Sequence, residues 1–529
     1  MTRGVERAAP RPPAVMDSLR VDEREPPLAV AVVAAASMLC AVLILRDLPA
    51  RSLWTDEFTS IDVASLPLRE IAAWAAGDVH PPLYYVLLHF WRELAGAGET
   101  AARIFSVLPA AATVPLVYLS ARHVAGWRVG LLTAVMLAVS PLLVLRGGMV
   151  RWYTLALALS WASILFFLRA VEGGGLRRWA LYAAATTLLI YTHYLPGSIV
   201  IGQGLYLLIE HRRDRRLARN FFLALSAVAL LYLPQLGVLA SQLLYAPHHG
   251  SPAPMAYGLK GAVVKAGYTL YAFALGETVL PWDLKVTAAA AAAFAAAALA
   301  GLVGAWRVRG VPAFVLCFLI VPLVFLILLT ATVFPSESFH LFPGLLLFVL
   351  PTFYLTAAIG LTVLPARLSA VSFAVIVAAW CYSLGNLYAK RGYINPNYVI
   401  PWREAAAVLE ERVRPGELVI ATDRSLYYYR RGVDMVLLDE TKRKGAVEET
   451  VERSAPPALW LQVRDRGNPE DTRHIETFRR SLSGRYRLAS ALGFVAEDPM
   501  TVSFKERLLR RPVPKYKLMI YRYVKKEEG

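Results

Sequence analysis

The stretch that decides the fold class is residues 28–45, LAVAVVAAASMLCAVLIL, which contains no charged side chain. A helix of about 20 such residues crosses a bilayer core of ~30 Å. Comparable blocks recur over the first three quarters of the chain. They lie at 28–45, 104–121, 129–145, 153–170, 179–195, 197–210, 220–237, 286–305, 311–333, 341–361 and 368–388. The sequence therefore predicts a polytopic α-helical membrane protein with about eleven spans, and a count between ten and thirteen stays open.

Composition and charge support this class. Of the 529 residues 57% are hydrophobic, and the net charge is +17, whereas soluble domains are about 45–50% apolar. The arginines lie in short loops between apolar blocks and form no basic groove, so we expect no nucleic-acid partner. The cysteines Cys40, Cys317 and Cys381 lie far apart inside apolar blocks, which is not the spacing of a zinc site or a disulfide framework.

The basic loops orient the chain. Residues 1–27 form a long tail of mixed charge, so we expect block 28–45 to be a retained span and the tail to be cytoplasmic. Loop 211–219, HRRDRRLAR, is the strongest basic anchor. With eleven spans the basic loops face the cytoplasm, as the positive-inside rule requires. Loop 46–103 and everything after residue 388 then lie outside a plasma (inner) membrane.

Segment 80–95, HPPLYYVLLHFWRELA, is a twelfth candidate span. Leu83, Leu87, Phe90 and Leu94 share one helical face, while Tyr85, His89, Arg92 and Glu93 cluster on another. This pattern is typical of a helix in the membrane interface. A span here would also move most basic loops to the outside. We therefore predict an interfacial helix, although the sequence leaves the choice open.

The character of the chain changes after residue 388. The long apolar blocks stop, and an amphipathic helix is predicted over Trp402–Val413. Short strands are predicted at Leu418–Thr422, Met435–Leu438, Leu459–Val463 and Leu518–Tyr521. We therefore divide the chain into a tail (1–27), a helical domain (28–388) and an extracytoplasmic α/β domain (389–529).

Two adjacent acids open the first outer loop, in the run LWTDEFTS. Asp56 and Glu57 follow the first span closely, where carboxylates can serve as a general base or as metal ligands. Thr55 and Asp56 also suit the start of a hydrated helix, which is the structural alternative.

The run His80-Pro-Pro-Leu-Tyr84-Tyr85 follows in the same loop. His80 can bind an anion or a metal, and the prolines fix the entry to the predicted interfacial helix. The tyrosines also suit a plain aromatic belt at headgroup level.

Arginines and histidines at other outer span ends complete the candidate set. Arg103, Arg146 and Arg151 run against the charge bias of the chain and suit a phosphate partner, or they snorkel to headgroups. His193, in YTHYLP, and His340, in SESFHLFP, lie at the same predicted membrane level. Ionisable groups at span ends are functional candidates, although a single histidine is more often structural.

Together, the motifs WTDE, HPPLYY, Arg103, the Arg151-Trp-Tyr run and YTHY resemble the GT-C superfamily of membrane glycosyltransferases. They are closest to the bacterial protein-O-mannosyltransferase-like group, which includes the lipid A aminoarabinose transferases. WREAAAVLEERVRPGELVIATD in the α/β domain is similar to the outer domain of many bacterial members. One departure is Ser338-Phe339-His340, where many members have an Arg-Tyr pair.

The resemblance implies a catalytic acid in the first outer loop, here Asp56 with Glu57 beside it. It implies a sugar donor on a polyprenyl phosphate or pyrophosphate and inversion at the anomeric centre. The leaving phosphate would be held by Arg103, Arg151 or a divalent metal, whose candidate ligands are Glu57, His80 and His193. The expected substrate-binding residues are His80, Tyr84, Arg103, Arg146, Arg151, Tyr153, His193, Tyr194 and His340.

The predicted function is transfer of a sugar from a polyprenyl-phosphate donor to an envelope acceptor, which is a lipid, a glycan or a protein. The partners are that donor, the acceptor and the surrounding membrane lipids. Two alternatives stay open. One is a transporter or flippase of a lipid-linked glycan, for which charged residues near mid-membrane, broken helices or inverted repeats would be expected. The other is a non-catalytic envelope scaffold.

Overall fold

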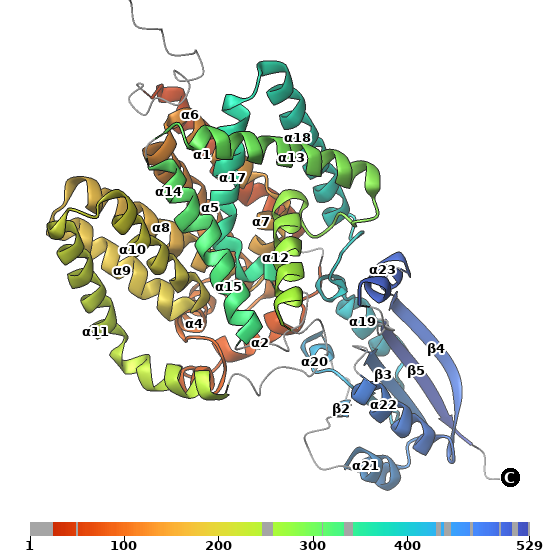
Figure 1. The fold of residues 1–529 in the computed structure, drawn as a ribbon. Helices are drawn as coiled ribbons and strands as arrows, with labels where there is room; N and C mark the ends of the chain where they lie inside the picture. The colour runs from red at the N-terminus through yellow and green to blue at the C-terminus, as the bar shows by residue number, and fades with distance from the viewer. Residues whose placement is uncertain are drawn as a thin grey trace, which may run out of the picture.

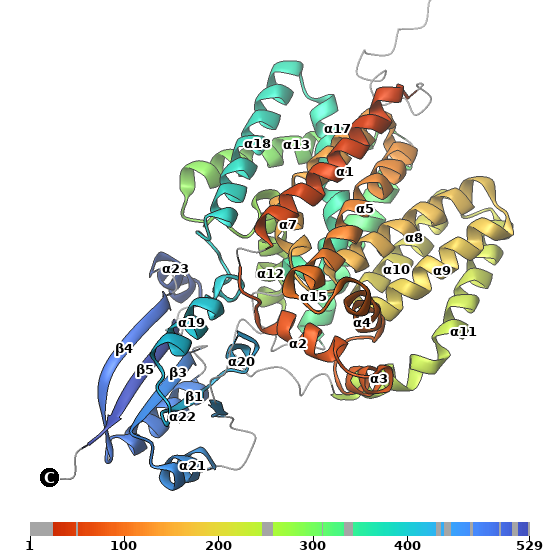
Figure 2. The same cartoon turned by 180° about the vertical axis from the view of Figure 1, so that it is seen from behind.

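The structure is a computed structural model that describes residues 25–48, 51–245, 258–308, 310–332, 342–429, 435–438, 446–465, 469–496, 499–509 and 517–526. A bundle of long helices forms the helical domain, and a small sheet with short helices forms the α/β domain (Figure 1). Helix α1 begins at the end of the bundle away from the sheet. Helix α2 lies at the end nearest the α/β domain in both views (Figures 1 and 2).

Where the structure describes them, the predicted apolar blocks lie largely on helices of the bundle. These are α1 (Pro27–Asp47), α5 (Glu99–Ala125), α6 (Trp127–Ala138), α7 (Pro141–Gly147), α8 (Tyr153–Gly173), α9 (Leu176–Thr192), α10 (Ser198–Glu210), α11 (Arg215–Tyr245), α13 (Leu284–Ala305), α14 (Val311–Val315), α15 (Val321–Thr332), α16 (Phe342–Leu345), α17 (Leu350–Val363) and α18 (Ala366–Tyr388). Among the described residues, seven helices are long and apolar enough to cross a membrane, or eight if one bent pair counts as a span. Three shorter apolar helices accompany them.

Two features of the bundle differ from the sequence prediction. Block 129–145, predicted as one unbroken span, consists of α6 and α7, which are bent by 54°. The bend follows from Ser140, which caps α7 by accepting from the backbone N–H of Leu143, and from Pro141, which has no N–H to continue α6. Loop 238–285, in which no helix was predicted, contains α12 (Gly258–Leu275).

The first loop folds into three short helices. They are α2 (Thr55–Ala64), α3 (Leu68–Gly77) and α4 (Leu83–Ala95). Helix α4 buries Tyr84 and Tyr85 but exposes Leu87, Phe90 and Leu94 on its other side. At 13 residues α4 is too short to span a bilayer. Its exposed apolar face agrees with the interfacial helix predicted for 80–95.

The α/β domain contains one five-stranded mixed sheet in the order β2-β1-β3-β5-β4. The strands are β1 (Leu418–Ala421), β2 (Met435–Leu437), β3 (Ala458–Asp465), β4 (Tyr486–Ala496) and β5 (Lys517–Lys525). Strands β1, β2 and β3 are parallel, whereas β5 runs antiparallel to both β3 and β4. The helices are α19 (Trp402–Arg412), α20 (Ser425–Tyr429), α21 (Ala446–Ser454), α22 (Pro469–Leu482) and α23 (Pro499–Leu509). The four predicted strands are present, and β4 was missed.

Helix α20 brings the α/β domain against the first loop (Figure 2). Phe58 of α2 makes edge contacts with the rings of Tyr428 and Tyr429, at centroid distances of 5.2 and 5.8 Å. The hydroxyl of Tyr429 also accepts from the backbone N–H of Leu53 at 2.7 Å. The segment leading into α2 is thus held by both domains.

Candidate active site

Asp56 lies in the first turn of α2, and its side chain is 34% exposed. Its Oδ2 is 3.6 Å from Nη2 of Arg151, whose own side chain is only 7% exposed. The start of a helix presents free backbone N–H groups and favours a carboxylate. Asp56 is therefore a partly accessible carboxylate beside a buried guanidinium.

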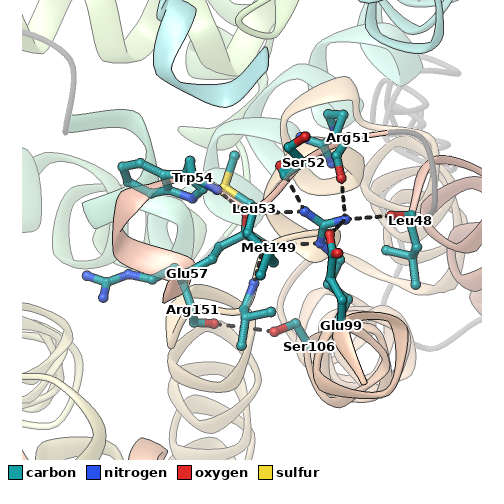
Figure 3. Close-up of polar contacts among 12 residues, drawn as sticks. Leu48, Arg51, Ser52, Leu53, Trp54, Glu57, Glu99, Ser106, Met149 and Arg151 are labelled. Atoms are coloured by element: carbon teal, nitrogen blue, oxygen red, sulfur yellow. Dashed lines mark hydrogen bonds and ion pairs between the residues drawn. The ribbon is translucent and has the colours of Figure 1, made fainter. Parts of the chain in front are cut away.

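Glu57, the neighbour of Asp56, is buried and fully engaged (Figure 3). Its Oε1 accepts from the backbone N–H of Val150 at 2.9 Å and from Nε of Arg103 at 3.2 Å. Its Oε2 accepts from the backbone N–H of Trp54 at 3.1 Å and from Nη2 of Arg103 at 3.3 Å. Both carboxylate oxygens thus hold neighbouring elements together.

Arg103, from α5, is 1% exposed and ties down the chain that enters α2. Its Nη1 donates to the carbonyls of Leu48 and Arg51 at 2.5 and 2.8 Å, and its Nη2 donates to the carbonyl of Ser52 at 3.2 Å. Nη1 also lies 3.0 Å from Glu99. The guanidinium predicted to bind phosphate thus holds the loop before α2.

His80 lies close to Arg151 and is oriented by Asp78, which sequence analysis missed. Nδ1 of His80 lies 2.8 Å from Oδ2 of Asp78, and Nε2 lies 3.5 Å from Nη2 of Arg151. Burial raises the pKa of Asp78, but the hydrogen bond and charge of His80 outweigh burial and leave that pKa below its ordinary value. The ring of His80 is thus oriented with Nδ1 toward the Asp78 carboxylate and Nε2 toward Arg151. The Asp-x-His spacing was the available signal.

His193 packs on the other side of this cluster. Its ring stacks on Trp152 at a centroid distance of 3.6 Å and lies 5.4 Å from the ring of His80. Nδ1 accepts from the backbone N–H of Leu195 at 3.2 Å. Burial, together with the positive charges of His80 and Arg151, lowers the pKa of His193 well below its ordinary value. His193 is thus held neutral beside the cluster.

The predicted tyrosines fall in different places. The ring of Tyr153 lies under both Arg146 and Arg151, with guanidinium-to-centroid distances of 5.2 and 5.9 Å. Tyr84 is buried against Phe105 on the α4 side, with a centroid distance of 5.7 Å. The hydroxyl of Tyr194 donates to Gln242 of α11 at 2.7 Å. Of the three, Tyr153 lies with the arginines.

Arg146 belongs to a second buried cluster, which sequence analysis missed. It forms an ion pair with Glu277, and both side chains are almost completely buried. Tyr268 donates to Oε1 of Glu277 at 3.1 Å, and Nη1 of Arg146 donates to the Tyr398 hydroxyl at 2.8 Å. Glu277 is 131 positions from Arg146, in a loop without a recognisable motif. This pair links α7, the loop after α12 and the entry to the α/β domain.

The predicted metal ligands do not converge. Both oxygens of Glu57 are taken by Arg103 and two backbone N–H groups. In the part of the chain that the structure describes, no group of three His, Cys, Asp or Glu side chains could hold a metal ion. Arg151 also lies within 3.5 Å of His80. The arrangement does not fit a divalent ion held by Glu57, His80 and His193, and His340 lies outside the described residues.

The site therefore combines an accessible carboxylate, a buried guanidinium and an oriented imidazole. Asp56 can accept a proton from a hydroxyl group. Arg151, with His80 beside it, can bind an anionic oxygen, and burial strengthens that attraction. Such a set suits a reaction in which a hydroxyl attacks and an anion departs.

Comparisons with known proteins give a family match to part of the chain and several similar solved structures. The family model of dolichyl-phosphate-mannose-protein mannosyltransferases matches residues 79–237. This segment contains His80, Arg103, Arg146, Arg151 and His193 but not Asp56. No curated protein matches the sequence.

Several solved structures share the whole-chain architecture. ArnT from Cupriavidus metallidurans bound to undecaprenyl phosphate superposes with a TM-score of 0.56 at 13% identity, covering 93% of this chain and 98% of that one. An Archaeoglobus fulgidus oligosaccharyltransferase tethered to an acceptor peptide gives a TM-score of 0.51 at 12% identity, covering 89% of this chain and 73% of that one. At these identities the likeness establishes the fold.

Proposed function

We propose that this chain, which has the fold of the GT-C superfamily of membrane glycosyltransferases, transfers a sugar from a polyprenyl-phosphate donor to an envelope acceptor on the outer face of the membrane. The observation that carries the proposal is Asp56, a partly exposed carboxylate 3.6 Å from the buried guanidinium of Arg151. ArnT, which has this fold, is solved with undecaprenyl phosphate. A polyprenyl-phosphate donor needs a cationic group to bind its phosphate and, next to it, a base to accept the proton of the acceptor hydroxyl.

The proposed reaction is a single displacement at the anomeric carbon. The acceptor hydroxyl oxygen forms a bond to that carbon while the bond from the carbon to the donor phosphate oxygen breaks. Asp56 takes the hydroxyl proton, and the lipid phosphate leaves with the bonding electron pair. Attack opposite the departing phosphate inverts the anomeric centre.

Arg151 and His80 stabilise the departing phosphate in this proposal. Arg151 offers a guanidinium with fixed geometry, and its burial removes competing water. The contact of Asp78 with Nδ1 orients the His80 ring so that Nε2 faces Arg151. When Nε2 carries a proton, it adds a second donor to a phosphate oxygen held by Arg151.

Glu57 and Arg103 act in the proposal by positioning. Their hydrogen bonds join α2, α5 and the turn at Val150. Val150 directly precedes Arg151, and Glu57 directly follows Asp56. The hydrogen bond from the Val150 N–H to Glu57 therefore fixes the distance between Asp56 and Arg151. Preorganised geometry of this kind is a large part of catalysis.

Sugar transfer by the purified protein in lipid tests the proposal. Wild type and Asp56→Asn are compared on a panel of polyprenyl-phosphate sugars, with product anomers assigned by NMR. Because Asn keeps the volume of Asp but not its basicity, we expect kcat to fall by on the order of a thousandfold while donor binding is retained. Equal activity of the two proteins would remove Asp56 from the proposed role.

The purified protein, reconstituted in lipid vesicles, also distinguishes the proposed transferase from the transporter alternative. The break between α6 and α7 is a feature expected of transporters. Movement of a fluorescent lipid-linked glycan across vesicles, without any transfer or hydrolysis on the whole panel, would overturn the proposal in favour of transport. Neither transport nor transfer on a widened panel would favour a scaffold.

A further inference from the structure

We propose that Arg464, a residue of the α/β domain, is a positioning residue that fixes the first turn of α2 and thereby Asp56. The inference rests on the proposed function of Asp56. Arg464 lies on β3, 409 positions from Thr55, yet its Nη1 donates to the Thr55 hydroxyl at 2.6 Å. Thr55 is the first residue of α2, directly before Asp56.

Three consecutive residues of α2 each contact an arginine from a different element. Thr55 accepts from Arg464 of β3. Asp56 lies beside Arg151, which precedes α8, and Glu57 pairs with Arg103 of α5. Successive side chains on a helix point about 100° apart, so these contacts restrain the turn from three directions. Two of the three restraints come from the helical domain, and Arg464 supplies the one from the α/β domain.

Arg464 is built to hold a fixed position. Its side chain is 5% exposed and pairs with Asp423 at 2.5 Å, while its Nη2 donates to Oδ1 of Asn397 at 2.7 Å. Its guanidinium carbon lies 5.8 Å from the centroid of the Trp402 ring. Because these contacts already fix the guanidinium, Arg464 loses little side-chain conformational entropy when it also binds Thr55.

Two other contacts between the domains lie on the residues just before α2. The hydroxyl of Tyr429 accepts from the backbone N–H of Leu53, and the backbone N–H of Arg403 donates to the Ser52 hydroxyl at 3.3 Å. These contacts hold the chain before α2. Tyr428 and Tyr429 touch α2 through ring contacts with Phe58. Arg464 makes a directed hydrogen bond to the first residue of α2, next to the proposed base, so in this proposal movement of the α/β domain is transmitted to Asp56 through Thr55.

Substitutions at Thr55 test the link with least disturbance. Thr55→Val keeps the shape and removes the hydroxyl, whereas Thr55→Ser keeps the hydroxyl. We expect Thr55→Val to lower kcat by tenfold to a hundredfold, on the order expected for a small misplacement of a catalytic group. Donor KM should change by less than about twofold, and Thr55→Ser should restore most of the activity.

Arg464→Met and a matched arginine complete the experiment. Arg479→Met is the control. Arg479 lies in the same domain, but it packs over the ring of Tyr521 at 4.1 Å and donates to the Tyr523 hydroxyl at 2.9 Å, both on β5. If Arg464 acts through Thr55, the double variant Thr55→Val/Arg464→Met will be no slower than Arg464→Met alone. The proposal would be overturned if the losses in kcat of the two single variants multiplied in the double variant. It would also be overturned if Thr55→Val were as fast as Thr55→Ser.

Hydrogen exchange separates this inference from the proposed function. Deuterium uptake over residues 51–64 should rise in Thr55→Val and Arg464→Met but not in Arg479→Met. Should wild type transfer no sugar, the proposed function fails, and exchange alone then decides whether Arg464 holds α2. Unchanged uptake in Arg464→Met would overturn the positioning role even if transfer is observed.

Discussion

At the scale of single residues, Asp56 and Glu57 are adjacent in sequence but differ in environment. Glu57 is buried in four hydrogen bonds, whereas Asp56 is one-third exposed beside one arginine. The sequence could predict the acidic pair but not which member is accessible, because that depends on Arg103 and Val150, 46 and 93 positions away.

This difference leads to a prediction about stability. Glu57→Gln removes one of the two carboxylates that pair with buried Arg103, the other being Glu99, and breaking a buried pair costs about 3 kcal/mol or more. Asp56→Asn also removes a carboxylate from a buried arginine, but Asp56 is itself 34% exposed and lies 3.6 Å from Arg151, so we expect a smaller loss than for Glu57→Gln. Thermal unfolding in one detergent should therefore show a large loss for Glu57→Gln and a smaller one for Asp56→Asn. Equal losses would contradict the assignment of Glu57 to the framework.

His193 leads to a prediction about pH. Burial, with the charges of His80 and Arg151, lowers its folded-state pKa, so below about pH 6.5 the unfolded chain binds a proton that the folded protein does not. Stability should therefore fall as pH decreases through that range, by up to about 1.4 kcal/mol per pH unit from this group. His193→Phe keeps an aromatic ring stacked on Trp152 but cannot bind a proton. Between about pH 7.5 and 5 the unfolding temperature of this variant should therefore decrease less than that of the wild type. A variant with the wild-type slope would show that His193 does not cause it.

At the scale of elements, the sequence predicts the long helices, whose length is set by the thickness of the bilayer. It does not predict a bend inside an apolar block or a strand with an irregular register. The long helices were predictable because crossing hydrocarbon requires about 20 apolar residues. The bend between α6 and α7 lies within one apolar block, where only Ser140 and Pro141 indicate it. Strand β4 was missed because its register shifts twice, next to Leu488 and next to Gly493, which breaks the alternation that marks a strand.

The crossing of α13 and α17 leads to a prediction about packing. A Cβ added at Gly360 would lie 1.7 Å from the carbonyl oxygen of Ala297, and this backbone atom cannot turn away. Gly360→Ala should therefore separate the two helices and lower the unfolding free energy by about 1–3 kcal/mol. Gly385→Ala in α18 is the control, since nothing lies within 4 Å of its added Cβ. A Gly360→Ala protein as stable as Gly385→Ala would refute the close crossing.

At the scale of the whole molecule, the first loop and the α/β domain lie at one end of the bundle (Figures 1 and 2). This agrees with their predicted location on one membrane face. The sequence could predict this because the number of apolar spans and the positions of the basic loops assign loop 46–103 and the chain after residue 388 to the same side of the membrane. The contact of Arg464 with Thr55 joins residues too distant in sequence for any local pattern to predict.

The orientation of the whole molecule can be measured with introduced cysteines. Arg213→Cys lies in the basic loop and Arg487→Cys on β4, both at exposed positions, in a Cys381→Ala background that removes the exposed native thiol. Because the loop at 211–219 carries five arginines, we expect it to stay in the cytoplasm. A membrane-impermeant maleimide should then label Arg487→Cys in intact spheroplasts and Arg213→Cys only after permeabilisation. The reverse pattern would put Asp56 on the cytoplasmic face, so the donor and acceptor would have to be sought there, while the geometry of Asp56 and Arg151 would be unaffected.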